Sequence, residues 1–254
     1  MSSSATDRLS VVPPFTVSGV HVAVELAPGA HAVFTTRRGG VSAGPYASLN
    51  LGRFTADDPD AVERNRAAVA TELGVRLASM RQVHGNRVVR VRDLRGDGEP
   101  PPEADGQATA LSGVAMTVLT ADCLPVAVAS KGAVAMLHAG WRGLAAGIID
   151  EGVRAVRELG ADGSMTAAIG PGAGLCCYEV GEEVHAALAG ESGSARHGDN
   201  LDLKGIARCQ LERAGVDVIY DVQLCTICSH PSLLYSHRRD RGLTGRQAGI
   251  AWLS

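Results

Sequence analysis

Apolar and polar positions repeat with two different periods along this chain, so the pattern predicts a mixture of strands and helices. Short apolar runs, alternating or continuous, predict strands at Val20–Leu26, Ala32–Thr35, Gln82–Val91, Val114–Thr120, Leu124–Ala129, Ala133–His138, Met165–Ile169, Val216–Tyr220 and Gly249–Leu253. Longer stretches with a helical period predict helices after Asp58 and at Leu144–Leu159, Glu179–Ala189 and Asp202–Ala214.

Turn residues divide these elements. Asp58 can cap a helix whose first position is Pro59 and whose end is Gly74. Lys131-Gly132 predicts a hairpin turn. The segment Arg37–Asn50 is rich in Gly, Ser and Pro, which predicts a long ordered loop of the kind that often carries function. Helices and strands alternate unevenly around a central hairpin, which favours a mixed sheet in an α/β or α+β domain. We expect a flexible leader over residues 1–14 and one domain over 15–254.

Composition narrows the class of protein. The chain has 254 residues, of which 45% are hydrophobic and 20% charged, so it can bury a substantial core. The net charge is −3, aromatic residues make up 4%, and the Lys and Arg residues form no long basic stripe, which argues against nucleic-acid binding. No signal peptide is visible and no apolar stretch reaches the ~18 residues that span a bilayer. We therefore expect a cytoplasmic protein without a membrane partner. The sequence does not reveal the oligomeric state, and a monomer is the working expectation.

Three residues of metal-ligand type stand at the edges of apolar runs: His84, Cys123 and His138. Two imidazoles and one thiolate suit zinc, and three protein ligands leave a tetrahedral position open for chemistry. Zinc at such a site lowers the pKa of bound water from ~15.7 toward ~7. The three residues match no short spacing rule, however. Taken alone, they favour the alternative of a buried cysteine and structural histidines.

Four other cysteines have open roles. Cys225 and Cys228 form a C-x-x-C segment that resembles half of a zinc knuckle or a redox pair. No matching second pair stands at zinc-ribbon spacing, which favours a structural or incidental role. Cys176 and Cys177 are neighbours, and one of them can face the site. The nearby Gly170–Leu175 segment lacks the features of a phosphate loop and is interpreted as a tight turn.

Several ordered motifs together resemble the laccase-domain family, also known as YfiH-like proteins or peptidoglycan editing factors. They run from Thr35 to the C-terminal region and include Thr35–Ser42, Ser48–Gly52, Asn65-Arg66, Gln82–Gly85, Thr120–Val126, His138–Gly143, Ile169–Pro171, Cys177–Val180, Arg238–Asp240 and Thr244–Arg246. The resemblance implies that His84, Cys123 and His138 bind one zinc ion per chain. It also implies a layered α-β-β-α sandwich with mixed sheets, similar to the catalytic domain of cytotoxic necrotising factors.

The resemblance implies three different activities: polyphenol oxidation, purine nucleoside phosphorolysis with adenosine deamination, and hydrolysis of wrongly built peptidoglycan precursors. A laccase needs a multicopper site whose ligands come largely as His-x-His pairs, and the eight histidines include no such pair. Copper oxidase activity is therefore disfavoured, although a single copper ion is an alternative occupant because copper outbinds zinc at His and Cys ligands.

We expect a zinc-dependent purine nucleoside phosphorylase acting on adenosine, inosine and methylthioadenosine, with adenosine deaminase activity. Arg37 and Arg142 are the candidate phosphate contacts, and a loop-pinning ion pair is the alternative role. Arg238 and Arg246 are further candidates. Asp122 can orient a ligand, move protons or simply form a turn. Two other hypotheses stay open, namely a hydrolase that removes a misincorporated amino acid from a UDP-linked peptidoglycan precursor, and a non-catalytic zinc-binding partner protein.

Overall fold

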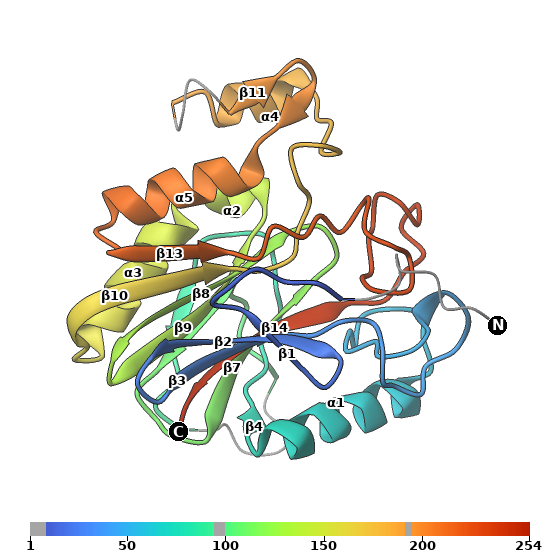
Figure 1. Ribbon diagram of the computed structural model, residues 1–254, viewed down its shortest axis with the longest axis horizontal. Coiled ribbons are helices and arrows are strands. Elements are labelled where there is room, and N and C mark those ends of the chain that lie inside the picture. The colour runs from blue at the N-terminus through green and yellow to red at the C-terminus, as the bar shows by residue number, and fades with distance from the viewer. Residues whose placement is uncertain (1–8, 94–99, 191–194) are drawn as a thin grey trace.

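Two six-stranded mixed sheets dominate the computed structural model, which describes residues 9–93, 100–190 and 195–254 (Figure 1). The first sheet has the order β1 (Thr16–Ser18), β2 (His21–Ala27), β3 (Ala30–Phe34), β14 (Gln247–Leu253), β7 (Val114–Thr120) and β4 (Arg76–Leu77). The second has the order β13 (Val218–Asp221), β10 (Asp162–Ile169), β8 (Leu124–Lys131), β9 (Ala133–Ala139), β6 (Gly106–Thr109) and β5 (Val88–Arg90). Strands β11 (Arg196–His197) and β12 (Asn200–Leu201) form a separate pair.

Helices cover the outer faces of both sheets (Figure 1). The described residues form the helices α1 (Pro59–Leu73), α2 (Trp141–Ala145), α3 (Ile148–Glu158), α4 (Glu182–Ala187) and α5 (Leu203–Arg213), together with a 3-10 turn at η2 (Gly44–Tyr46). One apolar cluster joins α1 to the first sheet, a second fills the space between the sheets, and a third joins α3 and α5 to the second sheet. The mixed α/β class is therefore confirmed, and its layers are ordered helix, sheet, sheet, helix.

Some strands are apolar on both faces because each face packs against a different layer of the fold. In β7, Ala115 faces the α1 cluster whereas Met116 faces the space between the sheets. In β8, Val126 faces the α3 cluster whereas Ala127 faces the other sheet. Neighbouring side chains on a strand point to opposite faces, so strands buried on both faces contain almost continuous apolar runs.

Local signals in the sequence predict α1 and the central hairpin correctly. The Asp58 side chain accepts a hydrogen bond from the Asp60 N–H, Pro59 starts the helix, and Gly74 ends it in the left-handed region with φ +65°. Strands β8 and β9 pair in antiparallel fashion around the Lys131-Gly132 turn. The chain reaches β8 from β7, which lies in the other sheet. The short link Ala121–Cys123 therefore crosses between the two sheets.

Three predicted elements are wrong in extent. The helix predicted over Glu179–Ala189 is reduced to α4 (Glu182–Ala187). Of the predicted strand Gln82–Val91, the structure retains only β5, because the first half turns sharply at His84, which has φ +61°. The predicted helix Leu144–Leu159 is divided into α2 and α3 by Gly147 at φ +84°.

The N-terminal segment, which the sequence predicts to be a flexible leader, is described only in part. Residues 1–8 of this segment lie outside the described residues. Leu9 and Val11 are partly buried against the cluster between the sheets. Within the described ranges, none of the helices combines the length and the apolar composition needed to span a bilayer.

Candidate active site

His84, Cys123 and His138 come together, although they are distant in the sequence. One ligand atom from each residue lies within 4.8 Å of the others. The imidazole rings of His84 and His138 meet edge to face, with centroids 4.8 Å apart. His84 is exposed, Cys123 is half-buried and His138 is buried. Two nitrogen donors and one sulfur donor at this separation could hold a metal ion, and this set of donors is one that suits zinc.

Two of the three residues stand at or beside the end of a strand, and the third stands in a loop. Cys123 ends the link between the sheets and directly precedes β8. His138 is the last residue but one of β9, where it faces Pro125 of β8 across the ladder. His84 stands in the loop after β4. Two paired strands and one anchored loop therefore hold the three donors, and such a rigid support favours a preorganised site.

Asp105 fixes two of the three residues, and sequence analysis did not identify it. Its carboxylate is fully buried and accepts hydrogen bonds from the backbone N–H groups of Val83, His84 and Gly85 at 3.2, 2.9 and 2.7 Å. It also lies 2.8 Å from Nδ1 of His138. This contact leaves Nε2 of His138 as the donor atom for a metal, an arrangement common among metal-binding histidines.

Neighbouring charged groups shift the pKa values of two of the three residues, Cys123 and His138. Burial opposes ionisation of Cys123, but His138 and His84 outweigh it and lower the pKa of the thiol to about 6. Burial likewise opposes protonation of His138, yet Cys123 and Asp105 raise its pKa to about 9. Both directions favour a thiolate beside an imidazolium over two neutral groups. A metal ion at these residues would take the thiolate and neutral imidazole forms, so its binding would displace a proton from His138.

Gly140 makes room for the cysteine sulfur. A Cβ at this position would lie 2.9 Å from Sγ of Cys123 and 3.7 Å from Cδ2 of His84. The glycine of the His138–Gly143 motif is therefore required by close packing against the side chains of two of the three donors rather than by an unusual φ angle.

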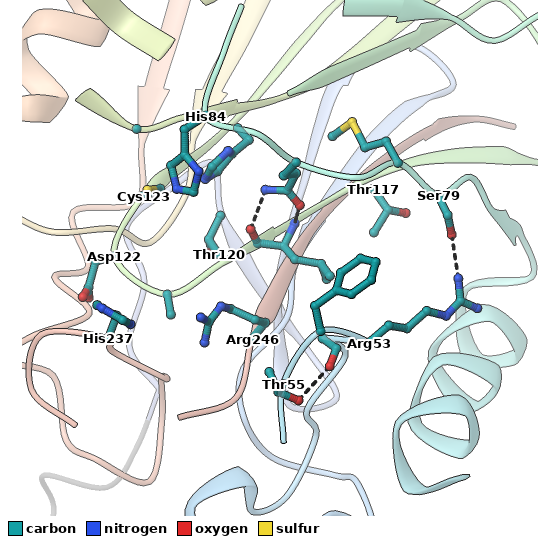
Figure 2. Close-up of a pocket in the computed structure, with 18 of the residues that line it drawn as sticks. Arg53, Thr55, Ser79, His84, Thr117, Thr120, Asp122, Cys123, His237 and Arg246 are labelled. Atoms are coloured by element: carbon teal, nitrogen blue, oxygen red, sulfur yellow. Dashed lines mark hydrogen bonds between the residues drawn. The ribbon is translucent and has the colours of Figure 1, made fainter. Parts of the chain in front are cut away.

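A cavity of about 530 Å³ opens in front of the three residues. This volume lies within the range of roughly 300–1,000 Å³ that is usual for small-molecule sites. Figure 2 shows His84 and Cys123 at one end, Arg53 and Ser79 at the other, and Arg246 between them. The lining combines apolar and aromatic side chains with arginines, among them Phe54, Met80, Leu119, Arg142, Arg238 and Arg246.

The candidate arginines divide into two groups. Arg142, Arg238 and Arg246 line the cavity, whereas Arg37 is not among its lining residues. The Arg37 guanidinium donates to the backbone carbonyls of Pro45, Ala47 and Pro231 and lies 4.4 Å from the Tyr235 ring centroid. Arg37 therefore pins the long loop, and it does so through carbonyl groups rather than through an ion pair.

Asp122 lines the cavity, and both of its carboxylate oxygens have protein partners. One accepts a hydrogen bond from the Thr226 hydroxyl at 2.6 Å and the other from the Arg238 backbone N–H at 2.8 Å. Its backbone has φ +94°, an uncommon value for a residue other than glycine. Asp122, the residue beside Cys123, is thus hydrogen-bonded to two positions in the connection between β13 and β14.

A match to a family model covers residues 31–254, and the family is described as multi-copper polyphenol oxidoreductase laccase. The chain belongs to this family. The resemblance found in the motifs is thereby confirmed. The two clusters of potential metal ligands among the described residues are one group of two histidines and a cysteine and one group of four cysteines, and neither contains the histidine pairs of a multicopper oxidase.

Relatives within the laccase-domain family cover almost the whole chain. A purine nucleoside phosphorylase of Streptomyces coelicolor is 45% identical over 237 residues, which are 89% of this chain and 96% of the relative. The purine nucleoside phosphorylase YfiH of Escherichia coli is 37% identical over 236 residues, covering 89% and 94%. The crystal structure of the Bacillus licheniformis hypothetical protein YfiH aligns with a TM-score of 0.84 at 30% identity and covers 96% and 100%.

Four further cysteines form a second group, which does not supply a fourth ligand to the first. Cys176, Cys177, Cys225 and Cys228 have sulfur atoms that all lie within 4.8 Å of one another, and this group could hold a metal ion such as zinc. The C-x-x-C segment has no second pair at zinc-ribbon spacing, but the fold brings the Cys176-Cys177 dipeptide against it. In the described structure, the two metal-ligand groups share no residue.

Proposed function

We propose that this protein is a zinc-dependent purine nucleoside phosphorylase that accepts adenosine, inosine and methylthioadenosine and also deaminates adenosine. Two kinds of support converge on this proposal. Relatives that carry the name purine nucleoside phosphorylase are 37–45% identical over most of the chain. The cavity also offers the separate chemical features that a nucleoside and an inorganic phosphate would require.

One observation carries the proposal: the His84, Cys123 and His138 group opens into the same cavity as Arg142, Arg238 and Arg246. A metal-donor set alone suits many hydrolases, and arginines alone suit many anion sites. Their combination in a cavity of about 530 Å³ suits a reaction between a phosphate anion and a second, largely apolar molecule.

The residues of this chain have separable roles in phosphorolysis. The reaction breaks the glycosidic C–N bond, forms a C–O bond to phosphate, and leaves the base with a proton. Arg142 stacks over the Trp141 ring at 4.2 Å, which occupies the face of the guanidinium but leaves its in-plane N–H donors for phosphate. Phe54 is 78% exposed at the cavity and offers a ring on which a purine can stack. When bound, zinc supplies Lewis acidity to the reacting end of the substrate.

Incubation of zinc-analysed protein with adenosine, with and without phosphate, tests the proposal. We expect adenine and ribose 1-phosphate only when phosphate is present, and inosine in either condition. Chromatography separates these products. The absence of adenine from a fully zinc-loaded protein supplied with phosphate would overturn the proposed phosphorylase. Adenine formation that ignores phosphate would overturn it as well, since the bond would then be cleaved by water.

Replacing Arg142 by Met should raise the KM for phosphate by about 10- to 100-fold, with a much smaller change in the KM for adenosine. A charge-assisted hydrogen bond contributes about 1.5–3 kcal/mol, and every 1.4 kcal/mol corresponds to tenfold in affinity. Arg64→Met is the matched control, because Arg64 is exposed on α1 beside Asp58 and does not line the cavity. Equal KM values for phosphate in both variants would remove Arg142 from the phosphate site.

Arg37→Met separates the two arginine roles proposed from the sequence. Because Arg37 donates to three backbone carbonyls, its loss should lower the free energy of unfolding without a selective rise in the KM for phosphate. Thermal unfolding and steady-state kinetics on the same preparation distinguish the two effects.

A further inference from the structure

Two loops from different parts of the chain bring the second cysteine group together. Cys176 and Cys177 lie in the loop between β10 and α4, and Cys225 and Cys228 lie in the loop after β13. The two loops run side by side: Gly172 and Cys225 form a parallel bridge, and the Thr226 N–H donates to the Gly172 carbonyl at 3.0 Å. The sulfur atoms therefore meet because the backbones of the two loops are already joined.

The sulfur separations match a tetrahedral site. Zinc–sulfur bonds of about 2.3 Å place the corners of a regular tetrahedron about 3.8 Å apart. Sγ of Cys176 lies 3.6 Å from Sγ of Cys228 and 3.5 Å from Sγ of Cys177. All four sulfurs fall within 4.8 Å of one another, and all four cysteines are free thiols. One ion can therefore reach the four sulfurs with small adjustments of the side chains.

Backbone N–H groups point at the most buried of the four sulfurs. The Gly174 N–H donates to Sγ of Cys225 at 3.3 Å. The backbone N–H groups of Ile227 and Cys228 are hydrogen-bonded to the same sulfur. N–H donors around a sulfur stabilise the thiolate form that binds metal. Gly174 also allows the close approach, because a Cβ there would lie 3.3 Å from Sγ of Cys176 and 3.4 Å from Sγ of Cys225.

We propose that Cys176, Cys177, Cys225 and Cys228 bind a second zinc ion as a four-thiolate site, separate from His84, Cys123 and His138. Four sulfur donors in a tetrahedral arrangement leave no position for substrate, which is the pattern of structural zinc. The ion would clamp two loops that adjoin the wall of the cavity. Tyr178 lines the cavity directly after Cys177, and Thr226, directly after Cys225, holds Asp122 through its hydroxyl.

Zinc counting with matched variants tests the proposal. Protein purified under reducing conditions is saturated with zinc, dialysed and analysed for metal per chain. Relative to the unmodified protein, Cys228→Ser and Cys225→Ser should each lose one zinc ion, whereas Cys209→Ser should lose none. Cys209 is the sixth cysteine, lies on α5, and belongs to neither group. A Cys228→Ser protein that keeps the full zinc content would overturn the second site.

The same count distinguishes this proposal from the proposed function. His84→Ala should lose a different zinc ion, so the losses in His84→Ala and Cys228→Ser should add in the double variant. If only the cysteine variant loses zinc, the four-thiolate site stands and the catalytic metal fails. If only His84→Ala loses zinc, the four-thiolate site is overturned. Iron in the cysteine group of a protein offered ferrous iron and zinc together would overturn zinc as its occupant, because zinc binds such ligands more tightly than ferrous iron.

An experiment on the unmodified protein avoids any folding defect of the variants. Cys176 and Cys228 are exposed, so an alkylating reagent can reach both thiols when the group is metal-free. Zinc should slow alkylation of all four cysteines by at least about tenfold, and a strong chelator should restore it. Peptide mass spectrometry follows each cysteine, with Cys209 as the internal reference. Equal alkylation of Cys228 with and without zinc would contradict the proposal. A disulfide within the group that persists under reducing conditions would contradict it as well.

Discussion

Replacement of His84 by Ala is expected to remove the metal from the site formed by two histidines and Cys123, and to lower turnover by about 10³-fold or more. A metal ion supplies several kcal/mol of charge stabilisation, and each 1.4 kcal/mol is about tenfold in rate. The variant should remain folded, because the His84 side chain is exposed and its backbone N–H still reaches Asp105. Metal analysis, phosphorolysis kinetics and thermal unfolding on one preparation measure the three consequences.

His197→Ala is the matched control, since His197 is an exposed histidine on β11 outside both metal-ligand groups. It should keep the metal content and the activity of the unmodified protein. Full activity of a metal-free His84→Ala protein would contradict the proposed zinc-dependent mechanism. Activity that returns when imidazole is added to the variant would support it, because a free imidazole can take the position of the missing side chain.

Short-range signals predicted the elements whose ends depend on neighbouring residues. The limits of α1 were readable because Asp58, Pro59 and Gly74 each act within one helical turn. The same reasoning failed at Gln82–Val91, where apolar residues suggested a strand. There the N–H groups of Val83, His84 and Gly85 turn toward the Asp105 carboxylate instead of a neighbouring strand. A hydrogen-bond partner that lies far along the chain does not alter the local pattern of apolar and polar residues, so this pattern cannot predict it.

The residues of the candidate site were likewise predictable only in part. Residue types and strand-edge positions indicated His84, Cys123 and His138 as candidate metal ligands. Their spacing did not favour a common site, whereas the ordered family motifs did. Asp105 was missed because an aspartate before a short strand is a common feature, and only the pairing of β6 with β9 brings it to His138. The Cys176-Cys177 pair was seen but not joined to Cys225 and Cys228, since the contact depends on two loops from different parts of the chain.

Asp105 is the residue whose loss should affect the site and the fold together. Asp105→Ala would leave three backbone N–H groups and the His138 ring without their shared acceptor in a fully buried position. Unsatisfied buried donors cost about 1–3 kcal/mol each, and loss of one partner of a buried charged pair costs about 3–5 kcal/mol. We therefore expect the free energy of unfolding to fall by about 3–5 kcal/mol and zinc affinity at the site of His84, Cys123 and His138 to fall by about 10- to 100-fold.

Denaturant unfolding of the metal-free protein and competitive zinc titration separate these two effects. Asp105→Asn tests the charge, because the amide retains the volume and one acceptor oxygen but places N–H donors against the donors of the loop. It should be intermediate in stability and still weak in zinc affinity. Asp217→Ala is the control, as Asp217 is an exposed aspartate that accepts hydrogen bonds from Ser164 and the Met165 N–H. Zinc affinity that is equal in Asp105→Ala and Asp217→Ala would mean that His138 and His84 hold their positions without the carboxylate, and the metal site would then depend on the strand framework alone.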